Sequence, residues 1–148
     1  MANFLAFTAH MPARTLERGE TLTELGEYTG EMYVLEEGRL TVERDGVVIA
    51  TLSEPGAVIG EMAVLLGSAH TATVRAADRS TVRTIVDAIG FLERTPLAAL
   101  HVATIACARL DATSALVVSL KHELEIPTPH PGLFARLLGA LTGPMPPS

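Results

Sequence analysis

The first part of the chain, residues 14–86, alternates hydrophobic and polar positions in the short runs that are typical of β-strands. Asp45-Gly46 lies between two such runs, 40–43 and 47–52. This pair predicts a hairpin because glycine adopts positive φ without strain. Short strands with recurring glycine turn signals predict a β-roll or barrel.

Two further features interrupt or extend this β pattern. Residues 36–38 predict a second hairpin, between the strand-like runs 33–35 and 40–42. Residues 60–67 lack alternation and end in glycine, which predicts one or two helical turns, and residues 71–76 alternate again as a strand. A short helix inserted into a β-roll exposes N–H groups at its start, and these attract anions.

The second part of the chain is predicted to be helical. Residues 87–94 form a short helix, and Thr95-Pro96 is typical of an N-cap followed by proline at the first position of a longer helix, which we expect to run to about residue 125. Steps of four and three residues define an a/d seam along it: Ala99, Ala103, Ala106, Leu110, Thr113, Val117, Leu120 and Leu124. The seam predicts a homodimer through this helix. The alternative is that the stripe packs on the chain's own β domain.

Composition narrows the class of protein. The chain has 148 residues, of which 48% are hydrophobic, and a net charge of -6, so we expect one globular domain with no broad nucleic-acid surface. Its single cysteine, Cys107, excludes an internal disulfide and is expected to be a small buried apolar residue.

No signal peptide and no stretch long enough to span a bilayer are predicted, so we expect a soluble cytoplasmic protein. The domain is predicted over 1–126, followed by a Pro-rich linker and tail over 127–148, with no room for a DNA-binding domain.

Residues 58–76, called the cassette from here on, carry the most specific pattern in the chain. They resemble the phosphate-binding cassette of the cyclic nucleotide-binding domain family, which includes catabolite activator proteins and the regulatory subunits of cAMP-dependent protein kinase. The family pattern is Gly-Glu, a short helix, then Arg-x-Ala-x-Val. The resemblance extends over about residues 14–123. It implies a double-stranded β-helix, a jelly-roll-like β-roll, with a short phosphate-binding helix and a long C-terminal helix.

The resemblance also implies a ligand site. Gly60 would let the backbone approach the sugar, and Glu61 would accept a hydrogen bond from the ribose 2′-hydroxyl. The phosphate would face N–H groups at the helix start and after it, including those of Met62, Ala63, Thr71 and Ala72. The alternative role for Glu61 is a helix-start carboxylate that satisfies the helix dipole.

Thr113-Ser114 in the long helix resembles the Thr-Ser pair that approaches the adenine in catabolite activators. This favours cAMP as ligand, with cGMP possible. The alternative is a Thr113 hydroxyl bonded to a carbonyl of its own helix.

His70 departs from the family, which carries arginine at this position. An arginine makes a forked contact with the phosphate, whereas an imidazole reaches less far and only about a quarter of it is charged at pH 7. Arg75 is a nearby cation, but strand alternation places it on the opposite face.

Three functions follow as hypotheses. The first is a cyclic nucleotide sensor that signals through its C-terminal helix to an unknown effector protein. The second is a degenerate member that serves as a ligand-independent dimerisation module, motivated by His70. The third is a cupin-type enzyme, but the metal set of such enzymes needs His-x-His and the β region holds one histidine. We therefore expect no catalytic residues, no metal and no cofactor.

Overall fold

A computed structural model describes residues 4–124 of the chain. The chain divides into two compact units, one ending at Ala103 and the other starting at Thr104. The long helix α3 (Pro96–Glu123) begins in the first unit and ends in the second. The predicted tail over 127–148 lies outside the described residues.

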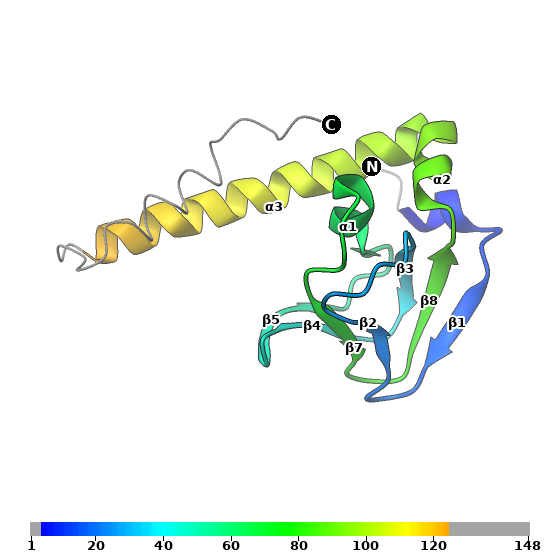
Figure 1. Cartoon of the computed structure of the whole chain (residues 1–148), viewed down its shortest axis with the longest axis horizontal. Coiled ribbons are helices and arrows are strands. Elements are labelled where there is room, and N and C mark those ends of the chain that lie inside the picture. The colour runs from blue at the N-terminus through cyan, green and yellow to red at the C-terminus, as the bar shows by residue number, and fades with distance from the viewer. Residues whose placement is uncertain (1–3, 125–148) are drawn as a thin grey trace. The chain divides into compact units, whose positions relative to one another are not determined.

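The first unit is built on two four-stranded antiparallel sheets, with strand orders β1-β8-β3-β6 and β2-β7-β4-β5 (Figure 1). This confirms the predicted β-roll. The strands are β1 (Ala13–Leu16), β2 (Thr21–Thr23), β3 (Met32–Glu37), β4 (Leu40–Arg44), β5 (Val47–Leu52), β6 (Val58–Ile59), β7 (Thr73–Ala76) and β8 (Ser80–Ile85). The helices are the 3-10 turn η1 (Phe4–Thr8), α1 (Glu61–Leu66), α2 (Ala88–Arg94) and α3.

Both sheets contribute side chains to a hydrophobic cluster between them. This cluster is aliphatic apart from one tyrosine. Its buried members are Leu16, Leu22, Tyr33, Leu35, Leu40, Ile59, Val74, Ala76 and Val82. Burial alternates along β7, which places Val74 and Ala76 in the core, whereas β3 is buried at four successive residues.

The predicted hairpin at residues 36–38 is wrong. Strand β3 pairs with β8 and β6, whereas β4 pairs with β5 and β7, so the chain crosses here from one sheet to the other. Gly38 makes the crossing with a φ of +108°, and a Cβ there would lie 2.3 Å from Oγ of Ser80. Hairpins and sheet crossings share the same local turn signals, so the sequence pattern does not separate them.

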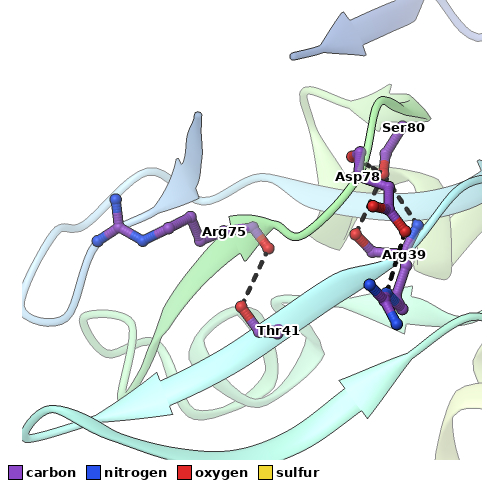
Figure 2. Close-up of polar contacts among 5 residues, drawn as sticks. All are labelled: Arg39, Thr41, Arg75, Asp78 and Ser80. Carbon is purple, nitrogen blue, oxygen red and sulfur yellow. Dashed lines mark hydrogen bonds and ion pairs between the residues drawn. The ribbon is translucent and has the colours of Figure 1, made fainter. Parts of the chain in front are cut away.

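Hydrogen bonds and an ion pair among Arg39, Asp78 and Ser80 stabilise the crossing next to Gly38 (Figure 2). The main-chain N–H of Arg39 donates to Oγ of Ser80 at 3.0 Å, and the same hydroxyl lies 2.8 Å from the carbonyl oxygen of Asp78. Nε of Arg39 is paired with Oδ2 of Asp78 at 3.1 Å. The buried serine thereby replaces the ladder bonds that the crossing chain cannot make.

The hairpin predicted at Asp45-Gly46 is confirmed. Asp45 and Gly46 have φ angles of +52° and +78°, and β4 and β5 pair antiparallel on either side of them. Strand β5 lies at the edge of its sheet, and its apolar residues 47–49 are exposed.

The predicted helices are also present. Asp87 caps α2, because its carboxylate accepts the N–H of Gly90 at 3.1 Å. Within α3, Ala98 and Val102 are buried, but most seam residues beyond them are exposed, including Leu110.

Two expectations about the long helix are wrong. Cys107 is exposed. An 18-residue stretch of α3 has a mean hydropathy of 1.4 and no more than two charged side chains, with 6% of it buried. By length and composition alone this stretch could cross a bilayer, although core helices of soluble proteins meet the same criterion. Our prediction missed it because polar residues such as Arg109 and Asp111 interrupt the run.

Replacing Gly38 with alanine tests the crossing. Gly38→Ala should lower the free energy of unfolding by about 2–4 kcal/mol, because a side chain there is both strained at positive φ and in collision with Ser80. Gly19→Ala is the matched control, since Gly19 has a φ of +90° but open space around it, and should cost about 1–2 kcal/mol. Urea denaturation measures both, and equal losses would contradict the steric part of the argument.

Candidate functional site

The cassette is organised around the start of α1. Gly60 is the N-cap residue, with a φ of +87°, and Glu61 is the first residue of the helix. The helix has six residues and ends at Gly67, whose N–H bonds to the carbonyls of Ala63 and Val64. A glycine at each end therefore limits the helix to the predicted length. Glu61 is 6% exposed, so its carboxylate is held within the fold.

Gly60 is closely surrounded. A Cβ at this position would lie 3.0 Å from the carbonyl oxygen of Glu31 and 3.3 Å from Cε1 of His70. The structure therefore brings three predicted site residues together, Gly60, Glu61 and His70, as the family pattern implies. It adds the start of β3, which the sequence pattern did not indicate.

The imidazole of His70 points into the domain. The side chain is 5% exposed, and Nε2 lies 2.9 Å from Oγ1 of Thr29. The main chain of His70 is fixed as well, because Gly26 N–H donates to its carbonyl and its own N–H donates to the carbonyl of Glu27, both at 2.8 Å. The position of the family arginine is thus taken by a ring that is packed and hydrogen-bonded inside the protein.

Two other predicted residues meet at the cassette surface. The hydroxyl of Thr71 lies 3.8 Å from the sulfur of Met62, whose side chain is 53% exposed. Ala63 is buried, and the carbonyl of Ala72 accepts the hydroxyl of Thr23 at 3.5 Å. Of these side chains, Met62 and Thr71 have polar or polarisable atoms facing outward.

Arg75, the alternative cation, is engaged elsewhere. Its Nε is paired with Oε2 of Glu43 at 3.7 Å, and Nη1 donates to the carbonyl of Gly19 at 3.3 Å. Figure 2 shows its side chain extending away from the Arg39 corner, while its carbonyl accepts the hydroxyl of Thr41. These contacts fit the prediction that it faces away from His70.

Thr113 and Ser114 belong to the second unit, whereas the cassette belongs to the first. The Thr113 hydroxyl donates to the carbonyl of Arg109, one turn earlier, at 2.8 Å. This is the alternative that the sequence left open for Thr113. Contact of either residue with a base stays a prediction.

A cavity of about 560 Å³ lies beside the loop that holds His70. It is lined by Arg14, Thr21, Leu22, Glu24, Glu27, Thr29, Glu31 and Tyr33. Within it the Tyr33 hydroxyl donates to Oε2 of Glu31 at 2.5 Å. Burial raises the pKa of Tyr33, and the bond to Glu31 raises it further. Sequence reasoning missed this cavity because its lining residues are scattered over three strands and a loop, with no recurring spacing.

A comparison with protein families settles what the cassette belongs to. The family model described as cyclic nucleotide-binding domain matches residues 13–87, which include both sheets and all of the cassette. The chain belongs to the cyclic nucleotide-binding domain family. The predicted resemblance is thereby confirmed.

Solved structures of similar fold include regulators of several kinds. A catabolite activator protein from Thermus thermophilus matches with a TM-score of 0.69 and 21% identity, over 78% of this chain and 57% of its own. A protein of a cyclic-GMP-dependent signalling pathway that regulates bacterial phytopathogenesis matches with a TM-score of 0.64 and 22% identity, over 76% and 94%. The regulatory subunit of a cAMP-independent protein kinase A from Trypanosoma brucei matches with a TM-score of 0.52 and 16% identity, over 56% and 30%. This chain thus spans little more than half the length of the Thermus protein, and the likeness shows the shared fold.

Over residues 4–124, no group of three or more His, Cys, Asp or Glu side chains is placed to hold a metal ion. A cupin-type site would need such a set.

Tyr33, the buried tyrosine of the cavity, should make the stability of the fold depend on pH in the alkaline range. Because the pKa of Tyr33 is raised above its ordinary value of 10.0, the folded protein keeps the phenol proton at pH values where the unfolded chain loses it. Stability is therefore complete below about pH 10 and falls as the pH rises above it. Tyr33→Phe should lose less stability between about pH 9 and pH 11 than the wild type does. Tyr28→Phe, at a tyrosine that is 67% exposed, is the control, and identical alkaline profiles for wild type and Tyr33→Phe would contradict the prediction.

Proposed function

We propose that this chain is a cyclic nucleotide-binding regulatory module, not an enzyme, that binds cAMP and signals through its C-terminal helix to an effector protein. The observation that carries the proposal is the buried Glu61 at the first position of α1, directly after a glycine with positive φ, inside a family-matched cassette. A buried carboxylate at a helix start that faces a sugar-sized ligand selects a hydroxyl donor.

The binding mode follows from the cassette. Glu61 accepts a hydrogen bond from the ribose 2′-hydroxyl, and Gly60 leaves room for the sugar beside the backbone. Main-chain N–H groups of Met62 and Ala63, together with those of Thr71 and Ala72, face the phosphate. The exposure of Met62 and the hydroxyl of Thr71 beside it support access from solvent on this side.

Ligand preference depends on the base. We assign the adenine contact to Thr113 and Ser114, which favours cAMP over cGMP, and this contact requires the Thr113 hydroxyl to leave the carbonyl of Arg109. One relative of similar fold acts in a cyclic-GMP-dependent pathway, so cGMP is included in every titration below.

The second candidate function is a ligand-independent interaction module. The specific observation in its favour is the inward imidazole of His70, which is buried and bonded to Thr29 instead of facing the cassette surface. The Trypanosoma brucei regulatory subunit, which belongs to a cAMP-independent protein kinase A, carries the same fold. The two candidates differ in one measurable property, the affinity for a cyclic nucleotide.

Restoring arginine separates the two candidates. A hydrogen bond to a charged group contributes about 1.5–3 kcal/mol, so His70→Arg should bind cAMP about ten- to a hundredfold more tightly than the wild type in calorimetric titration. His122→Arg adds the same charge at an exposed position of α3 and should leave the affinity unchanged. Glu61→Gln should weaken binding in both backgrounds.

The outcomes assign the function. Weak binding by the wild type and tight binding by His70→Arg support the sensor. Heat from His70→Arg alone, with none from the wild type at millimolar cAMP or cGMP, identifies the interaction module. The absence of binding in both proteins contradicts any nucleotide-binding role.

We also propose that α3 pairs with the α3 of a second copy, in a cytoplasmic homodimer. Seam residues such as Leu110 (49% exposed), Leu120 (45%) and Leu124 (50%) expose large apolar side chains along one line. A parallel partner helix would remove this surface from water.

Charge placed on the seam tests the dimer. Leu110→Glu should be monomeric in light scattering, because a buried carboxylate without a partner is costly at a helix interface. Val118→Glu is the matched control, since Val118 is 51% exposed but lies off the seam, and it should remain dimeric. A wild-type chain that is monomeric at every concentration would exclude this interface.

A further inference from the structure

Thr29 lies outside the cassette, in the loop between β2 and β3, yet it makes the only hydrogen bond that the described contacts give to the imidazole of His70. We propose that Thr29 is a positioning residue that holds this imidazole inward and thereby limits the affinity of the cassette for a cyclic nucleotide. The inference rests on the proposed function and identifies how the same site is regulated. Neither the family pattern nor the sequence analysis includes Thr29.

The main chain of His70 is not free to move toward the ligand. Two hydrogen bonds of 2.8 Å tie its N–H and its carbonyl to Glu27 and Gly26 of the same loop. The imidazole can therefore reach the cassette surface only by rotation of the side chain. The hydrogen bond from Nε2 to Thr29, at 2.9 Å, is what such a rotation has to break.

The hydroxyl of Thr29 is itself held in place. It accepts the main-chain N–H of Glu31 at 3.2 Å, which orients its oxygen toward the ring. The ring atom next to Nε2 is close to Gly60, since Cε1 would lie 3.3 Å from a Cβ built there. Thr29 and Gly60 thus both lie beside the Nε2–Cε1 edge of the imidazole.

A phosphate that binds Nε2 competes with Thr29 for the same atom. Nε2 carries either one proton or one lone pair, so it makes one hydrogen bond at a time. When it is bonded to Thr29 it is not available to an anion at the cassette. The apparent affinity of the site is then reduced by the fraction of molecules in which the ring points outward.

Removing the hydroxyl should raise the affinity. Thr29→Val keeps the shape of the side chain and deletes the hydrogen bond, so we expect cAMP to bind about two- to tenfold more tightly than to the wild type. Thr29→Ser restores the hydroxyl and should return the affinity to the wild-type value. Thr21→Val is the control, because Thr21 lines the same cavity as Thr29, and this change should leave the affinity for cAMP unchanged.

The effect should act through His70. In the His70→Arg background, Thr29→Val should alter the affinity by less than twofold, because the imidazole that Thr29 holds is gone. All titrations use the full chain, and circular dichroism confirms that each variant is folded. Thr29→Ala replaces Thr29→Val if the valine variant does not fold.

A spectroscopic signature completes the test. In the nucleotide-free protein, the ¹⁵N shift of Nε2 of His70 and the deuterium exchange rate at Cε1 should change in Thr29→Val and return in Thr29→Ser. Unchanged or weaker cAMP binding by Thr29→Val, with tight binding by His70→Arg, overturns the role of Thr29 and leaves the proposed function intact. No binding by either the wild type or His70→Arg overturns the proposed function, and the role of Thr29 falls with it.

Discussion

The backbone at Gly60 is the constraint on which the site depends. The chain turns there through a φ of +87°, within van der Waals reach of the Glu31 carbonyl and the His70 ring. A side chain at this position would be strained at this φ and tight against both neighbours. Gly60 directly precedes α1, whose first residue is the buried Glu61. A Cβ at Gly60 would also meet the residue before β3 and the ring of His70, so this glycine lies where the loop and the cassette come together.

The exchange of arginine for histidine at position 70 changes the charge of this side chain and the number of hydrogen-bond partners that it needs. A guanidinium carries a permanent charge and five donors, which a single threonine hydroxyl cannot satisfy, so an arginine at position 70 would be costly to bury. An imidazole can be neutral and needs few partners, and Thr29 supplies one at 2.9 Å. One substitution thus allows the side chain to be stored inside the domain. We propose that the same property makes the affinity of the cassette depend on Thr29, a loop residue.

The long helix α3 leaves most of its apolar side chains exposed. Only Ala98 and Val102 of its residues are buried, and large apolar side chains remain exposed along the rest of its described length. The first unit has its own aliphatic core between two sheets, whereas α3 exposes large apolar side chains. Exposed apolar surface of this kind is typical of interaction sites. The homodimer that we propose would bury it.

The sequence by itself determined the elements that local rules control. Positive φ at Asp45-Gly46, the Asp87 cap, the start of α3 at Pro96 and the cassette between Gly60 and Ala76 all follow from interactions within a few residues.

Tertiary structure alone decided what depends on residues that are distant in the chain. A glycine such as Gly38 is an equally good turn signal for a hairpin and for a crossing between sheets. The crossing is stabilised by Ser80, 42 positions later, which packs against Gly38 and accepts the N–H of Arg39. Thr29 and His70 are 41 positions apart, and no spacing in the sequence predicts their contact. Such pairs form only when the two sheets stack and bring the loop before β3 against the cassette. Periodicity and φ preference determine the elements, whereas packing determines which elements meet.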